Sequence, residues 1–377
     1  MLPRFDASAD AVLDDPYPEY ARLRAAGGLG RGGPGQWVVS RHAEVAALLR
    51  DRRLSTDYPE DYHRYSVGDG PAVDFFRRIV LDRDPPAHTR LRRLMALAPS
   101  VVRAAARRVE RTVDELLRDR TGLDVVADLA VPLPVSVICD LLGVPPADRD
   151  VVRDRVADLA RGFAVTVRQQ DRAAAHDAVV WLREYMAALP ARSGLLAALR
   201  AGTDRAEADD NAVFLFFAGF ETTANLIATG FDALTRHPDQ WALLRADPDR
   251  APAAVEEFLR YDAPIQAAAR MVAEPVAVGD RVLRPGRLVV LLLGSANHDE
   301  TVFADPTRLD ITRAPNPHVG FGGGAHTCLG AALARAEGVA VFRWLARNRA
   351  VLDRAGEAER RRAFTFRAFT ALPVTLA

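Results

Sequence analysis

One cysteine of this chain stands where a reactive sulfur is favoured. Cys328 lies between the glycine-rich stretch 320–326 and a segment, 328–347, whose apolar residues recur at helical spacing. Backbone N–H groups and the positive end of a helix favour a thiolate over a thiol, and glycines, which have no Cβ, let a backbone approach a flat cofactor. No second Cys or His stands at the spacing of a structural zinc site. A lone thiolate of this kind suits the iron of a haem.

The residues around Cys328 also match a known pattern. They resemble the haem-binding signature of the cytochrome P-450 family, F-G-x-G-x-H-x-C-x-G, at Phe321, Gly322, Gly324, His326, Cys328 and Gly330. A chance match is on the order of one in a million at this chain's residue frequencies. The alternative for Cys328 is an inert buried cysteine before a helix. Cys139 is different, because it lies on the predicted apolar helix 135–142 and is interpreted as a plain core residue.

The resemblance implies a mainly α fold with a minor β-sheet region, the helix-rich triangular prism of the cytochromes P-450. In that fold one haem b, iron protoporphyrin IX, lies between the long central helix and the cysteine-bearing helix. Cys328 would be the axial ligand of the iron, and residues 1–377 would form a single domain. The family positions that contact the haem here include Phe321, His326, Gly330 and Ala218.

An apolar helical segment, predicted from Asp209 past Thr235, carries a second pattern. Glycine in mid-helix costs about 1 kcal/mol relative to alanine, so Gly219 calls for a reason. The Thr222 hydroxyl can compete for the carbonyl of Ala218 and open a local groove. The stretch resembles the family's oxygen-activation motif, A-G-x-[DE]-T-T, which assigns hydrogen bonding during oxygen activation to Thr222 and proton relay to Glu221. A buried helix with a threonine of no special role is the alternative.

Glu257 and Arg260 stand three residues apart on the predicted helix 252–261 and can form a forked ion pair. Taken alone, such a pair is an ordinary surface feature. It resembles the family's E-x-x-R element, which braces the cysteine loop, with Arg313 as the expected third member. The resemblance gives these three residues a structural role and no chemistry.

Haem propionates need cationic and hydrogen-bonding partners. His88 and Arg92 share one helix face at i,i+4 spacing and match the family pattern H-x-x-x-R, while Arg270 and His326 occupy the other family positions that bind propionates. Each could instead be a solvated charge.

One departure from the family is Asn297-His298-Asp299-Glu300, where relatives carry Asn-Arg-Asp-Pro. The departure bears on local packing and not on the chemistry.

Composition excludes several classes of protein. Fifty basic and fifty acidic residues cancel, so no net field favours nucleic acid or an anionic membrane. Two cysteines cannot make a disulfide framework, no signal peptide is evident, and the longest apolar runs fall short of the roughly 20 residues that span a bilayer. We therefore expect a cytoplasmic protein without membrane or nucleic-acid partners. A monomer is also expected.

The predicted elements are mostly helical. Helices are indicated over 16–25, 88–98, 101–118, 148–168, 176–188 and 194–201, besides those named above. Strands are predicted over 36–39, 276–278, 281–283, 288–293 and 372–376. Residues 55–86 lack a sustained period, which predicts a long functional or disordered loop.

The resemblance implies a monooxygenase that hydroxylates or epoxidises a largely apolar small molecule, in bacterial secondary metabolism. Electrons would come from a separate ferredoxin or flavodoxin-type donor with its NAD(P)H-dependent reductase, docked near Arg92, Arg93 and the arginines at 103, 107, 108 and 111. One alternative is oxidative coupling or desaturation without oxygen insertion, and another is a haem-thiolate sensor.

By analogy the substrate pocket would be lined by residues 55–86, 160–168, 214–217 and 265–269 and by the turn near Phe369.

Overall fold

A computed structural model describes residues 2–163, 169–191 and 194–377. The chain forms two compact units. The first comprises Met1–Leu54, Pro99–Pro134 and Thr222–Ala377, and the second comprises Ser55–Ala98 and Val135–Glu221. The long helix α12 (Arg205–Arg236) begins in the second unit and ends in the first. The mainly α fold with a minor sheet is confirmed, whereas a single domain over 1–377 stays a prediction.

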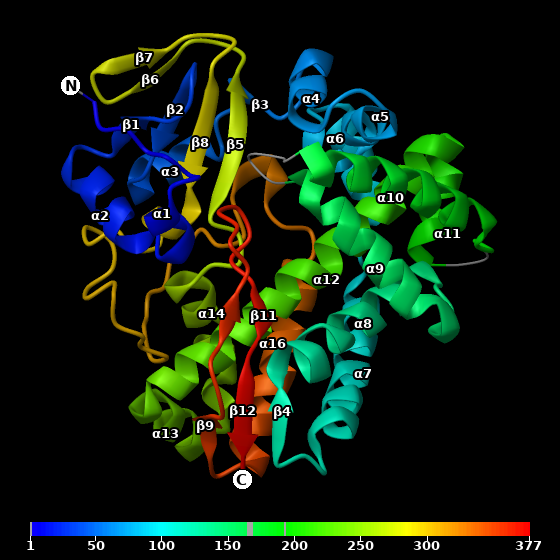
Figure 1. The fold of residues 1–377 in the computed structure, drawn as a ribbon, viewed down its shortest axis with the longest axis vertical. Coiled ribbons are helices and arrows are strands. Elements are labelled where there is room, and N and C mark those ends of the chain that lie inside the picture. Colours follow the sequence, from blue (N-terminus) through cyan, green and yellow to red (C-terminus); the bar gives the residue numbers. More distant parts are fainter. Residues whose placement is uncertain (1, 164–168, 192–193) are drawn as a thin grey trace. The chain divides into compact units, whose positions relative to one another are not determined.

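The main sheet of the first unit has the strand order β1-β2-β8-β5-β3 (Figure 1). Strand β8 (Leu288–Leu292) runs parallel to β2 (Gln36–Val39) and antiparallel to β5 (Ala267–Val272). Val289 and Leu291 enter one hydrophobic core, and Val290 and Leu292 enter another on the opposite face. Because both faces are covered, β8 is a continuous apolar run rather than an alternating one. The outer strands of the sheet are β1 (Leu29–Arg31) and β3 (Leu54–Ser55).

Three smaller sheets complete the β structure of the described residues. Strand β12 (Pro373–Leu376) pairs with β4 (Gly122–Asp124) and β9 (Leu352–Arg354), all antiparallel. Strands β6 (Val276–Val278) and β7 (Arg281–Leu283) form a hairpin, and β10 (Glu359–Arg360) pairs with β11 (Phe369–Ala371).

Most of the chain is helical. In the first unit, α16 (Ala331–Asn348) packs against α7 (Pro99–Leu117) and α14 (Ala251–Tyr261). The remaining helices of this unit are α1 (Asp10–Asp14), α2 (Tyr17–Ala25), α3 (His42–Leu48), α13 (Pro238–Ala246) and α15 (Leu293–Ala296). The second unit contains α4 (Glu60–Val67), α5 (Pro71–Arg78), α6 (Ala87–Met95), α9 (Arg149–Ala160), α10 (Gln169–Ala188) and α11 (Gly194–Gly202), and α8 (Pro132–Leu142) lies almost wholly within it.

The structure corrects the expectation of a long loop over residues 55–86. This stretch holds two helices, α4 and α5, and α5 buries Phe75 and Phe76. Both helices have eight residues, too short for the apolar positions to repeat over several turns, which explains why the sequence shows no sustained period. Strands β1 and β5 were also not predicted, whereas the long helix from Asp209 was.

Within the described ranges, α12 alone is long and apolar enough to cross a membrane by length and composition. Of its most apolar 18-residue window, 78% is buried inside the protein. Such burial is typical of a core helix.

Candidate active site

A glycine-built turn presents Cys328. The Gly322 N–H donates to the Val319 carbonyl at 2.8 Å, and the Cys328 N–H donates to the Phe321 carbonyl at 2.9 Å, which closes the turn. Gly322 and Gly324 both have φ of +68°, the left-handed region that side chains disfavour, and a Cβ on Gly324 would collide with the backbone of Leu49. Cys328 itself is exposed and lies three residues before α16 begins.

The surroundings of the sulfur fit a flat metal-bearing group. A Cβ added at Gly330 would lie 4.0 Å from the Cys328 Sγ, so the absence of a side chain there leaves space beside the sulfur. The thiol is accessible and precedes the N-terminus of an 18-residue helix, whose unpaired N–H groups favour the anion. Phe321, His326 and Gly330, predicted to contact a haem, are all partly exposed on this turn.

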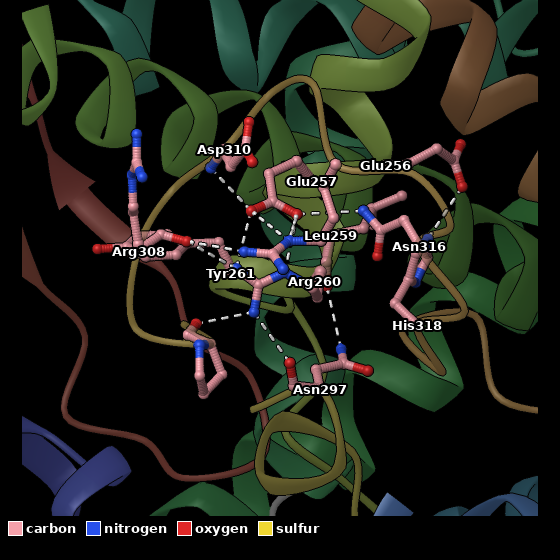
Figure 2. Close-up of polar contacts among 12 residues, drawn as sticks. Glu256, Glu257, Leu259, Arg260, Tyr261, Asn297, Arg308, Asp310, Asn316 and His318 are labelled. Atoms are coloured by element: carbon pink, nitrogen blue, oxygen red, sulfur yellow. Dashed lines mark hydrogen bonds and ion pairs between the residues drawn. The ribbon is translucent and has the colours of Figure 1, made fainter. Parts of the chain in front are cut away.

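A buried ion pair lies within the first unit near the start of this loop. Arg260 donates to both oxygens of Glu257, Nε to Oε2 at 2.7 Å and Nη2 to Oε1 at 2.8 Å, and both side chains are fully buried (Figure 2). Arg313 Nε approaches the same carboxylate at 3.2 Å. The structure therefore brings Glu257, Arg260 and Arg313 together, inside the protein rather than at its surface.

The loop supplies partners for the remaining donors of Arg260 and the remaining acceptor positions of Glu257. Glu257 also accepts from the Asp310 N–H at 2.9 Å and from Asn316 Nδ2 at 3.1 Å. Arg260 donates further to the carbonyls of Asn297, Pro306 and Arg308 at 2.8–3.1 Å. A buried charge pair is stable only when its other lone pairs and protons are satisfied in this way.

The departure at Asn297–Glu300 is accommodated by the packing. Asn297 Oδ1 accepts from the Val319 N–H at 2.8 Å, at the start of the cysteine turn. His298 Nε2 lies 2.8 Å from the Tyr261 carbonyl, and its ring packs on Tyr17 with centroids 4.3 Å apart. Burial and the nearby Arg260 lower the pKa of His298 to about 3, so the ring is neutral. Glu300 pairs with Arg24 at 3.0 Å.

A second carboxylate on α14 was not predicted from the sequence. Glu256 accepts from His318 Nε2 at 2.9 Å (Figure 2) and from Arg335 Nε at 2.6 Å and Nη2 at 2.9 Å. Burial opposes its ionisation, but Arg335 and His318 outweigh burial and lower the pKa of Glu256 to about 2. The only signal in the sequence was a second glutamate beside Glu257.

One face of α12 stays accessible within an otherwise buried stretch. From residue 207 to residue 234 every side chain is buried except those of Phe214, Leu215, Ala218, Gly219 and Thr222. These positions follow the spacing of one helix face. Glu221 is 6% exposed, although it stands three residues after Ala218 and seven after Phe214, at the edge of this face. The predicted oxygen-activation residues thus divide between the open face, with Thr222, and the buried interior, with Glu221.

The structure gives Gly219 a packing reason besides the one expected. Helix α12 is continuous through Ala218–Thr222, and the local groove at Thr222 stays a prediction. A Cβ on Gly219 would lie 3.0 Å from the side chain of Ile138 on α8. Close packing of α8 on α12 therefore favours glycine at this position.

The predicted propionate residues lie in both units. His88 (3% exposed) and the partly exposed Arg92 are on α6, and burial, with Arg92, lowers the pKa of His88. Arg270 is on β5, is 8% exposed and donates to the Ala269 carbonyl at 2.7 Å, and His326 is partly exposed in the cysteine turn. Their role as propionate contacts stays a prediction.

Comparisons with known proteins show the family of this chain. The Cytochrome P450 family profile matches residues 195–357. The chain is 34% identical over 391 residues to the biotin biosynthesis cytochrome P450 of Bacillus subtilis (strain 168), covering 98% of each protein. The chain belongs to the cytochrome P450 family. It is also 40% identical over 356 residues to nocardicin C N-oxygenase of Nocardia uniformis subsp. tsuyamanensis, covering 87% of this cytochrome P450 and 86% of that enzyme.

Solved structures agree as well. The crystal structure of P450BioI in complex with hexadec-9Z-enoic acid ligated acyl carrier protein matches with a TM-score of 0.92 at 33% identity, covering 98% of this chain and all of that one. This cytochrome P450 is thus a haem monooxygenase, and its fold and chemistry class follow from relatives aligned over nearly its full length.

The buried ion pair generates a stability prediction. Glu257→Gln leaves the Arg260 charge buried without a counter-ion, which should lower the free energy of unfolding by about 3–5 kcal/mol. The matched control is Glu19→Gln on α2, which has the same Glu-x-x-Arg spacing to Arg22 but lies at the surface and should cost less than about 1 kcal/mol. Denaturant unfolding of both variants measures the difference. Equal losses would contradict a special role for the buried pair.

Proposed function

We propose that Cys328 is the axial ligand of a haem b and that this cytochrome P450 hydroxylates or epoxidises a largely apolar small molecule in bacterial secondary metabolism. The observation that carries the proposal is an exposed thiol on a glycine-built turn, anchored by a fully buried carboxylate–guanidinium pair. His88, Arg92, Arg270, Phe321, His326, Gly330 and Ala218 are the proposed contacts of the haem. We further propose one catalytic domain over 1–377, acting as a soluble monomer in the cytoplasm.

The proposed haem supplies oxygen activation with electrons received one at a time. The chain's own contributions are the thiolate, a proton path and a shaped surface. The Thr222 hydroxyl lies on the accessible face of α12 and can donate and accept one hydrogen bond at once. Glu221 is adjacent in the chain and buried, and its carboxyl is the proposed relay of protons to that face. Both roles are proposals.

An aromatic cluster supports an apolar substrate. Within the second unit, the Phe163 ring stacks on Phe217 with centroids 4.3 Å apart, and contacts Phe76 at 4.8 Å and Phe214 at 6.3 Å. Phe214 belongs to the accessible face of α12. Aromatic walls of this kind bind apolar or aromatic ligands. Of the other predicted lining residues, 164–168 lie outside the described residues.

The electron donor is proposed to be a separate ferredoxin or flavodoxin-type protein, reduced by an NAD(P)H-dependent reductase. Arg103, Arg107, Arg108 and Arg111 on α7 are all exposed, at spacings that place them on one helix face. A row of guanidinium groups suits an acidic partner.

Substrate delivery by a carrier protein also has support. The related structure of P450BioI holds a fatty acid linked to an acyl carrier protein. A titration that follows the ferric Soret band, with free ligands beside carrier-linked ones, would show which form displaces water from the iron.

Replacing the proposed ligand tests the function directly. Cys328→Ser should abolish the red-shifted absorption band that a haem-thiolate gives on reduction under CO. Cys139→Ser is the control, since Cys139 is buried on α8 and burial raises its pKa to about 12, which keeps the thiol protonated. The band should survive in this variant. A band that persists in Cys328→Ser would show that another residue holds the iron.

Charge reversal tests the docking face. Arg93→Glu and Arg107→Glu should each slow reduction by an acidic donor at low salt, and the difference should fade as salt screens the charges. Arg281→Glu, on β7 and 54% exposed, is the control. Stopped-flow reduction across a salt series measures the rates. If the control slows reduction as much as the α7 reversal does, the effect is one of net charge and the docking face is wrong.

Thr222→Ala tests the proton path. Loss of the hydroxyl should slow product formation on the order of 10²-fold, the lower end of what a general acid–base group contributes. Thr229→Ala, buried on the same helix, should leave this rate unchanged. The measurement is the incorporation of labelled O₂ into product over time. Its absence in the unmodified enzyme would favour oxidative coupling or desaturation, and no turnover with any competent donor would favour a sensor.

A further inference from the structure

Glu256 joins both ends of the cysteine turn to helix α14. Its carboxylate holds His318, which precedes the turn, and Arg335, which follows it on α16. The two Arg335 bonds, at 2.6 and 2.9 Å, form a fork on the two carboxylate oxygens. The residues are 62 and 79 positions away from Glu256 in the chain. This network is separate from the Glu257–Arg260 pair.

The hydrogen bonds fix the form of His318. The Gly320 N–H donates to His318 Nδ1 at 3.1 Å, so Nδ1 carries no proton. The proton is therefore on Nε2, which donates to Glu256. The network thus holds one negative charge, on Glu256, and one positive charge, on Arg335.

Arg335 also reaches the cysteine turn directly. Its guanidinium carbon lies 4.4 Å from the centroid of the Phe321 ring, and the Phe321 carbonyl accepts the Cys328 N–H. The guanidinium of Arg335 therefore packs on the same residue, Phe321, that holds the backbone of Cys328 at 2.9 Å.

We propose that Arg335, held in place by Glu256 and His318, is a positioning residue whose positive charge tunes the Cys328 thiolate and so sets the reduction potential of the haem. The inference rests on the proposed function, in which Cys328 binds the iron. Reduction adds one electron to the site, and a nearby positive charge stabilises the reduced state. Glu256 partly cancels that charge. Because the Arg335 side chain is 43% exposed, water screens it and the shifts should be moderate.

Removal of the Arg335 charge and removal of the Glu256 charge should shift the midpoint potential in opposite directions. If the substitutions only loosened the loop, the two shifts would not be opposed. Arg335→Gln should move the midpoint potential to more negative values, and Glu256→Gln should move it to more positive values. Arg335→Lys keeps the charge and should restore most of the unmodified potential. Spectroelectrochemical titration of the haem-loaded protein measures all three. If both Gln variants shift in the same direction, or neither shifts, the proposal is wrong.

Two measurements keep this inference distinct from the proposed function. Arg343→Gln removes another arginine of α16, paired with Asp249 at 3.4 Å, and should leave the potential unchanged. The reduced CO spectrum of each variant reports whether the thiolate still binds iron. Loss of the red-shifted band in the unmodified protein overturns both proposals, whereas an intact band with no opposed shifts overturns only this one.

Discussion

The structure depends most on one carboxylate–guanidinium pair that has no access to water. Glu257 and Arg260 are both fully buried, and removing two charges from water costs several kcal/mol for each ion. The cost is offset here because Arg313, Asn316 and the Asp310 N–H complete the carboxylate, and three carbonyls complete the guanidinium. All these partners belong to the segment that leads to Cys328. The pair can therefore be buried only because the loop satisfies its hydrogen bonds, and the same hydrogen bonds hold the loop in its path.

A second constraint is the single accessible face of α12. A helix that is apolar nearly all round belongs in a core, and residues 207–234 of α12 are buried except for Phe214, Leu215, Ala218, Gly219 and Thr222. The residues of this face are small or apolar apart from one hydroxyl. At Gly219 the side chain of Ile138 on α8 packs close to the helix, so the missing side chain leaves room for α8.

Much of the site could be predicted because its signals are local. Cys328 and the glycines that place it fall within ten residues, and Glu257 and Arg260 within four. The network of Glu256, His318 and Arg335 could not be found this way, since its members are far apart in the chain and each resembles a surface charge. Strand β5 was missed because the alanines at 267–269 carry little strand preference. Their place is set by pairing with β8, a tertiary effect.

The two neighbouring glutamates of α14, Glu256 and Glu257, both anchor the segment around the cysteine turn. Adjacent side chains on a helix point in directions about 100° apart. Here Glu257 holds the loop that precedes the turn, whereas Glu256 holds His318 (Figure 2). Glu256 also holds Arg335 on the helix that follows the turn. Because both carboxylates come from one rigid helix, the two ends of the turn cannot shift independently. The position of the sulfur therefore depends on α14, which anchors both ends, as well as on the glycine-rich turn, which closes through the Cys328 N–H on the Phe321 carbonyl.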